Sequence, residues 1–165
     1  MDIVCTRKIA DQIRLTRLAK WTSANSLSCW YGNLFRAPRR AFVAAMESTT
    51  LVTVLFPAQG LTNAQSLADA LCSTIAAYFA HRGWTALLGR AIAFDDQPLK
   101  FWAATDRTMI GSIVEMVRLA SWDLEELTDD LTKVMDRTND APMSPIGMDA
   151  PDWILDRMAG KRGGR

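Results

Sequence analysis

The sequence predicts an α+β fold, with an antiparallel meander sheet of about four to five strands covered on one face by two or three main helices. Three observations lead to this prediction. Stretches rich in aromatic and β-branched residues are grouped within residues 28–56, and helical periodicity dominates after residue 62. Between these two parts, Pro57 and Gly60 end the strand-like pattern.

The size and composition fit a single domain. The chain has 165 residues, of which 49% are hydrophobic, so it can bury a core of its own. We therefore expect one α+β domain over residues 1–160 and a disordered tail at 161–165, where the sequence is KRGGR.

The elements of the N-terminal half follow from short alternating patterns. The stretch IVCT predicts a short strand, and RKIADQIRLTRLAKW predicts a short amphipathic helix after it. Residues 22–26 have the composition of a loop. Three strands are then expected at residues 28–36, 40–46 and 51–56, and the short polar turns between them predict two tight antiparallel hairpins.

The elements of the C-terminal half are mainly helical. Thr62 and Gln65 have the spacing of a capping box, which predicts a helix over 62–81 that Gly83 stops. A short helix is expected in WTALLGRAIA and a strand in LKFWAAT. Apolar spacing after residue 108 predicts one long helix, or two helices broken near Ser121-Trp122-Asp123. DWILDRM predicts a last turn of helix.

The strand over residues 28–36 and the turn after it form the first candidate binding surface. Alternation places Tyr31 and Asn33 on one face of the strand and Arg36 on the other, with Arg39 and Arg40 in the turn. If Tyr31 and Asn33 are exposed, they could stack on and hydrogen-bond to a single-stranded nucleic acid. The alternative, which we favour because no RNP-type motif accompanies them, is that the aromatic residues belong to the core.

Residues 105–112 form the second candidate. They run from an expected strand into a helix, where free N–H groups favour a small anion, and Arg107 could grip a phosphate or carboxylate beside Ser112. Phosphate-binding loops usually contain several glycines and a Lys-Ser/Thr pair, whereas this stretch has Gly111 alone. Ordinary helix capping is therefore the favoured interpretation.

Composition argues against several classes of function. The three cysteines are widely spaced and His81 is the only histidine, so we expect no disulfide framework, no metal site and no cofactor. A Ser or Cys nucleophile needs a base, and His81 is the only imidazole available, so no catalytic residue is predicted. No stretch has the length of a signal peptide core or a membrane span, and we expect a cytoplasmic protein without a membrane partner.

Charge and methionine content bear on partners. Residues 1–40 contain eight basic and two acidic residues, and residues 121–140 contain seven acidic and two basic residues. These segments either compensate each other or attract different partners. Met135, Met143, Met148 and Met158 lie near the C-terminus, where such adaptable side chains suit either a partner-binding surface or gaps in the core.

Several motifs resemble those of an uncharacterised bacterial family, a domain of unknown function. The resemblance extends over almost the whole chain and rests on CTRKIADQI, WYGNLFRAPRR, TTLVTVLFP, ATDRTMIGS and NDAPMSPIGMDAPDWIL. The chain departs from the pattern at Ile113-Val114-Glu115, where Met-Asn-Asp is expected, and at Glu47-Ser48, where an Asn is expected. The resemblance implies the fold and a bacterial setting, and it brings no known activity.

Together these observations predict a cytosolic, non-enzymatic interaction domain whose partner is another protein. Arg39, Arg40 and Arg107 are the expected polar contacts. The alternative is a nucleic-acid-binding protein, or a nucleic-acid-directed enzyme, that uses the basic N-terminal third.

Overall fold

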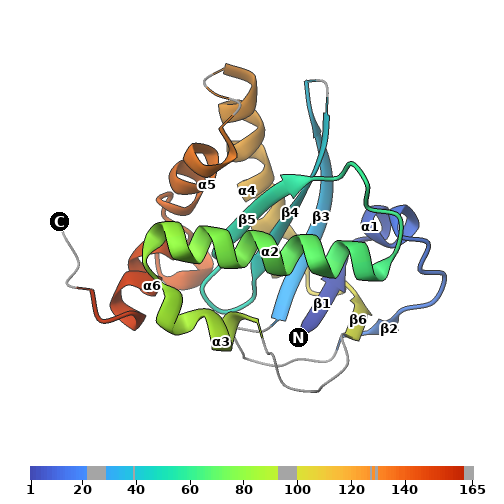
Figure 1. The fold of residues 1–165 in the computed structure, drawn as a ribbon, viewed down its shortest axis with the longest axis horizontal. Helices are drawn as coiled ribbons and strands as arrows, with labels where there is room; N and C mark the ends of the chain where they lie inside the picture. Colours follow the sequence, from blue (N-terminus) through green and yellow to red (C-terminus); the bar gives the residue numbers. More distant parts are fainter. Residues whose placement is uncertain (22–28, 39, 93–99, 127, 129, 162–165) are drawn as a thin grey trace.

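A computed structural model describes the chain except for residues 22–28, 39, 93–99, 127, 129 and 162–165. The strands of the described residues form one sheet in the order β2-β6-β1-β3-β4-β5 (Figure 1). The strands are β1 (Asp2–Cys5), β2 (Ala19–Lys20), β3 (Cys29–Ala37), β4 (Arg40–Glu47), β5 (Thr53–Pro57) and β6 (Lys100–Ala103). The α-helices are α1 (Arg7–Gln12), α2 (Ala64–Arg82), α3 (Leu88–Ala91), α4 (Arg107–Glu126), α5 (Leu131–Asn139) and α6 (Pro151–Met158), with 3₁₀ turns η1 (Thr85–Leu87) and η2 (Ser144–Ile146).

The sheet is mixed, so the prediction of a purely antiparallel meander is wrong. The meander itself is present, because β3, β4 and β5 pair antiparallel in sequence order. The other half of the sheet is parallel: β1 pairs with both β3 and β6, and β2 pairs with β6. Ile3, Val4 and Cys5 are all buried, as is typical of a strand covered on both faces in the parallel part of a sheet.

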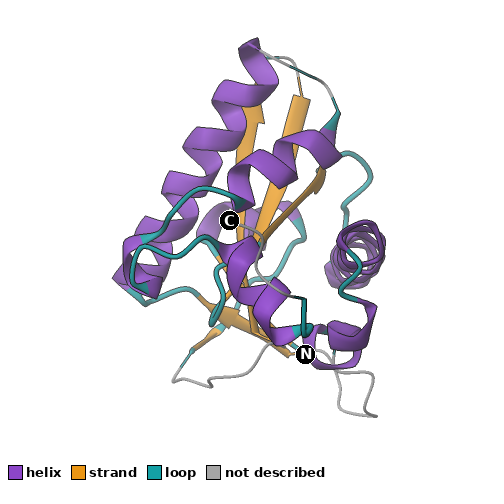
Figure 2. Cartoon of the chain, turned by 90° about the vertical axis from the view of Figure 1, so that its left-hand side faces the viewer, coloured by secondary structure: helices purple, strands orange, loops and turns teal. Residues whose placement is uncertain are grey.

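Helices lie on both faces of the sheet, not on one as expected from the sequence. Figure 2 shows the strands between α4 on one side and α2, seen end-on, on the other. Helix α1 packs on β3 at Gly32, where a Cβ atom would come 2.8 Å from Ile9 Cδ1. The absent side chain of Gly32 therefore lets α1 approach the sheet closely.

Helix α2 begins later than expected, because a different residue caps its N-terminus. Asn63 caps α2 in place of Thr62, because its side chain accepts from the Ser66 N–H at 2.9 Å and the Ser66 hydroxyl accepts from the Asn63 N–H. Gly83, in the left-handed region with φ +69°, ends α2 as predicted.

The break between α4 and α5 falls later than Ser121-Trp122-Asp123, because Asp130 caps the new helix by accepting from the N–H of Thr132. Helix α1 is also shorter than its amphipathic pattern suggests. It ends at Gln12, and Arg14 follows with φ +59°.

Helix α5 covers the open edge of β5. The Asn139 side chain accepts from the Thr53 N–H at 2.7 Å and donates to the Thr53 carbonyl at 2.8 Å, as a neighbouring strand would. The Leu55 N–H donates to Met135 Sδ at 3.3 Å. These contacts satisfy backbone groups that an edge strand leaves without partners, and they hold α5 beside the sheet.

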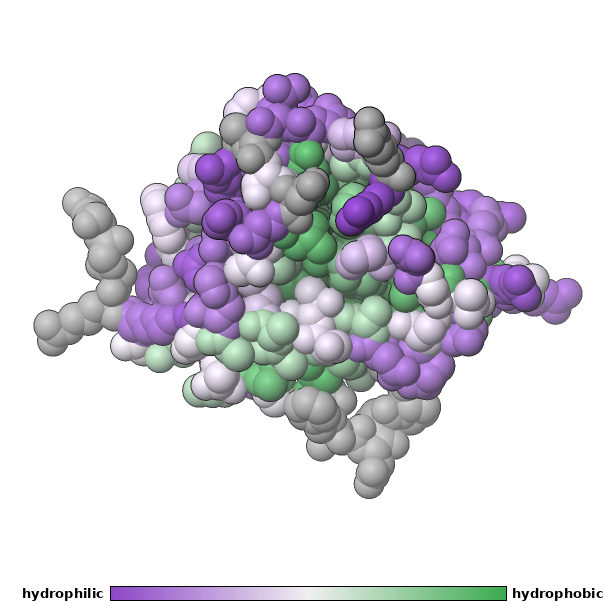
Figure 3. Space-filling model, turned by 45° about the horizontal axis from the view of Figure 1, so that its top comes forward, coloured by the Kyte–Doolittle hydropathy of each residue, from purple (hydrophilic) through white to green (hydrophobic). Residues whose placement is uncertain are grey.

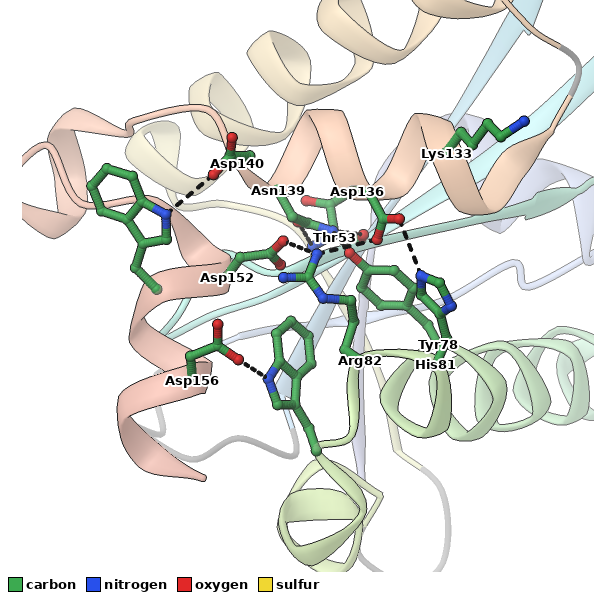
Figure 4. Close-up of polar contacts among 12 residues, drawn as sticks. Thr53, Tyr78, His81, Arg82, Lys133, Asp136, Asn139, Asp140, Asp152 and Asp156 are labelled. Carbon is green, nitrogen blue, oxygen red and sulfur yellow. Dashed lines mark hydrogen bonds and ion pairs between the residues drawn. The ribbon is translucent and has the colours of Figure 1, made fainter. Parts of the chain in front are cut away.

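A cluster around Arg82 joins the ends of α2, α5 and α6 (Figure 4). Arg82 Nη1 donates to Asp136 at 3.1 Å and also to Asp152, and its guanidinium carbon lies 4.9 Å from the centroid of the Trp84 ring. Asp152 is only 2% exposed. The Trp84 indole donates to Asp156 on α6 at 2.7 Å, so α6 is tied to Arg82 at the end of α2 and to Trp84 two residues later.

Two findings concern the chain ends and the membrane. Residues 162–165 of the expected tail lie outside the described residues, and the Lys161 ammonium donates to the Arg82 carbonyl. Within the described part of the chain, every helix is too short or too polar to span a bilayer.

Candidate functional site

A hollow of about 410 Å³ lies between the first turns of α4 and the segment that links α5 to α6. The linking segment lies beside the lower half of α4 in Figure 2. One wall comes from α4 and the other from Pro142, Met143, Ser144, Pro145 and Met148. Met148 is 61% exposed and Met143 is buried, so the wall offers apolar surface from the rim to the floor.

The opposite wall of the hollow is one continuous stripe of side chains on helix α4. Arg107, Thr108, Gly111, Ser112 and Glu115 line the hollow, at the spacing of three and four residues that keeps side chains on one face of a helix. Met109, Ile113, Met116, Ala120 and Leu124 are buried residues of the same helix. The stripe therefore lies beside the face of α4 that packs on the sheet, and the buried Ser112 lies at the boundary between the two.

A second hollow, of about 350 Å³, continues the stripe toward the C-terminal end of α4. Its lining consists of Leu119, Trp122, Asp123, Arg137, Thr138 and Ala141. Ala141 precedes Pro142 of the first hollow, and Leu119 follows Glu115 by one turn of α4, so the two hollows have neighbouring residues on both walls. From Thr108 to Trp122, α4 rises about 21 Å at 1.5 Å per residue. We call this surface the α4 groove.

Both predicted residues of the 105–112 stretch lie in the first hollow. Arg107 is exposed at its rim, and Ser112 is buried with its hydroxyl donating to the Thr108 carbonyl at 3.0 Å. The Asp106 carboxylate accepts from the N–H groups of Thr108 and Met109, at 2.8 and 3.2 Å. Asp106 therefore caps the helix with the negative charge that a bound small anion would otherwise supply.

The residues predicted on β3 and its turn do not gather at the groove. Tyr31 is 4% exposed, so the ring has no open face on which a base could stack, and its burial raises the pKa of the phenol to about 12. Asn33 is partly buried and accepts from the Thr6 hydroxyl at 3.3 Å. Arg36 and Arg40 are exposed near the tip of the β3–β4 hairpin, and Arg39 lies outside the described residues.

The basic and acidic segments do not pair with each other in the described part of the chain. The ion pairs of residues 121–140 join Asp123 to Arg137, Asp130 to Lys133, and Asp136 to His81 and Arg82. In residues 1–40, Arg7 pairs with Asp11. The ion pairs that these segments form are therefore with residues of the same segment or of α2.

Hydrophobic surface is not confined to the groove. The face shown in Figure 3 carries a band of hydrophobic side chains bounded by hydrophilic ones. The α4 groove differs in having hollows with defined walls, along a helix on the other side of the sheet from α2.

Sequence reasoning missed Trp122 as a site residue because it falls within the helical pattern near the expected break. Its side chain is 59% exposed, so Trp122 is not part of the core. The methionines gave a usable signal: Met143 and Met148 line the first hollow, whereas Met135 contacts β5. Among the described residues, no three His, Cys, Asp or Glu side chains are placed to share a metal ion.

A protein-family model matches residues 2–153, and its description is a domain of unknown function (DUF6933). No curated protein and no solved structure matches the chain.

Proposed function

We propose a binding function for this chain, which belongs to the DUF6933 family: its α4 groove holds an amphipathic helix of a partner protein. The observation that carries the proposal is the first hollow, in which an apolar wall faces one stripe of α4. Grooves of this kind receive the apolar face of a helix through side chains spaced at three and four residues.

The backbone of the groove favours a helix over an extended peptide. An extended peptide needs main-chain partners, which a free sheet edge would supply. Here the wall is α4, whose backbone groups are bonded within the helix, and the edge of β5 is covered by Asn139 and Met135. A ligand that satisfies its own backbone groups fits these conditions best.

The side chains favour a protein as the partner. Met143 and Met148 are flexible and polarisable, so they adapt to the shape of an apolar side chain. Arg107, exposed at one rim, offers a bidentate contact to a carboxylate of the partner helix. The proposed ligand thus combines apolar side chains on one face with an Asp or Glu at the end that lies beside Arg107.

The proposal is tested by site-specific photo-crosslinking from position 145 in the native host. We expect the crosslinked segment to map to one amphipathic helix, and a synthetic peptide of that segment to bind the purified protein. Met148→Asp should weaken this binding about tenfold to a hundredfold, because burying a methionine side chain is worth about 1.5–3 kcal/mol. Arg107→Glu should weaken it as well, by charge repulsion.

Matched variants make this test specific. Met158 is a partly exposed methionine on α6 outside the groove lining, and Arg90 is an exposed arginine on α3. Met158→Asp and Arg90→Glu should leave the binding of the peptide unchanged. If Met148→Asp binds the peptide as tightly as the wild type, the partner lies elsewhere and the proposal is wrong.

A further inference from the structure

The second hollow contains a buried carboxylate, whereas the carboxylate that lines the first hollow, Glu115, is exposed. Asp123 is buried, and the one side-chain contact to its carboxylate among the described residues is from Arg137 Nη1 at 3.5 Å, the outer limit of a hydrogen bond. The Arg137 side chain is more than half exposed. A weakly held, buried carboxylate of this kind has capacity for a further, stronger donor.

Thr138 gives an independent indication of a ligand. Its side chain lines the same hollow and is 1% exposed, and its hydroxyl oxygen has no hydrogen-bond partner among the described residues. Buried hydroxyls are nearly always satisfied, so this oxygen is a site where a donor is expected.

Trp122 completes the set of groups. Its indole lines the hollow and is largely exposed, which leaves ring surface available to a cation. A carboxylate, a hydroxyl acceptor and an indole together form the environment that an alkylammonium or guanidinium group prefers. An anionic ligand would meet the Asp123 charge at the same place.

We propose that the second hollow binds a lysine or arginine side chain of the partner, in exchange for the long contact between Asp123 and Arg137. This inference rests on the proposed function in one respect: the basic side chain is taken to belong to the partner helix. It adds a polarity to the ligand: an acidic residue lies beside Arg107 and a basic residue beside Asp123, at opposite ends of the α4 groove. The charges on α4 thus set the orientation in which the partner helix binds.

The test uses small probes, so it does not depend on knowing the partner. Nα-acetyl-lysine methylamide is titrated into the ¹⁵N-labelled full chain, with the norleucine and glutamate analogues as neutral and anionic controls. We expect the lysine probe to shift the Trp122 indole signal, with the indoles of Trp30 and Trp84 unchanged because they donate to Ala91 and Asp156 inside the protein. The lysine probe should bind at least threefold more tightly than the norleucine probe.

Three variants identify the groups that hold the probe. Asp123→Asn should weaken binding of the lysine probe about tenfold, which is close to the low end of what a close charge pair contributes. Thr138→Val should weaken it severalfold, and Arg137→Gln should tighten it, since the competing cation is removed. Unchanged Trp30 and Trp84 signals in each variant report that the fold is intact.

The opposite results would overturn the inference. They are equal binding of lysine and norleucine probes, preference for the glutamate probe, or loss of binding in Arg137→Gln. Met148→Asp, which tests the first hollow, should leave the lysine probe unaffected. If the lysine probe fails to bind while Met148→Asp still weakens peptide binding, only this inference is wrong. If the lysine probe binds as predicted while Met148→Asp leaves peptide binding unchanged, only the proposed function is wrong.

Discussion

Replacing Arg82 with methionine should destabilise the protein by about 3–5 kcal/mol at pH 8, because it leaves a buried carboxylate without its cation. Asp152 is 2% exposed and is held by Arg82, which also binds Asp136. Arg82 binds Oδ2 of Asp152, and the buried Oδ1 has no hydrogen-bond partner among the described residues. Methionine keeps the length of the side chain but supplies no charge, so the loss should appear directly in the free energy of unfolding measured with urea.

The loss should shrink as the pH falls. Burial, together with the neighbouring Asp136 and Asp156, raises the pKa of Asp152 to about 7 despite the opposing effect of Arg82. Because the folded-state pKa lies above the unfolded value, the stability contributed by this group is fully present below about pH 4 and is lost as the pH rises through about 7. Without Arg82 the pKa rises further, so acidification from pH 8 to pH 5 should stabilise the variant more than the wild type.

Two further variants separate the charge from the packing. Arg82→Met combined with Asp152→Asn should recover most of the lost stability at pH 8, since an amide carries no charge to compensate. Arg90→Met, at an exposed position on α3, should change the free energy of unfolding by less than about 0.5 kcal/mol. An equal loss in Arg82→Met at pH 5 and pH 8 would contradict this account of the cluster.

Replacing Asn139 with leucine should have a comparable effect on stability, about 3–6 kcal/mol, because three buried polar groups lose their partner at once. These are the Thr53 N–H and carbonyl and the Tyr78 hydroxyl, to which Asn139 donates at 3.2 Å. For a protein of this size, that corresponds to a fall in Tm of about 6–24 °C. Amide exchange should also accelerate at Thr53 and Leu55, where α5 covers the sheet edge.

Tyr78→Phe provides the graded comparison for Asn139. It removes only one of the three contacts and should cost about 1 kcal/mol. Lys133→Leu places a leucine at an exposed site on the same helix and should be close to neutral. If Asn139→Leu is no less stable than Tyr78→Phe, the edge of β5 does not depend on the amide.

The elements that could be predicted from sequence are those set by local patterns. The three meander strands, the helix that Gly83 ends, and the final helix after Pro151 all occupy nearly the predicted positions. The parallel pairing of β1 could not be predicted, because the partner of a four-residue strand is not encoded in its own alternation. Burial of three successive residues, Ile3 to Cys5, is the feature that reveals it, and burial becomes known only in the fold.

The site could be predicted only in part, for a similar reason. A local strand-to-helix junction predicts Arg107 and Ser112, but the wall opposite them comes from Pro142 to Met148, some thirty residues after Ser112. Their meeting depends on α5 being fixed to β5 by Asn139, a contact between residues 86 positions apart. Tyr31 illustrates the opposite limit, because alternation gives the face of a strand but not whether a helix covers that face.

The most direct test of the α4 groove follows the methionine methyl signals of ¹³C-labelled protein during titration with the crosslinked partner segment. We predict that the signals of Met143 and Met148 shift together and saturate at one peptide per protein. The signals of Met46 and Met116, which are fully buried, should not move. Binding that leaves Met143 and Met148 unshifted would contradict the assignment of the groove as the binding site.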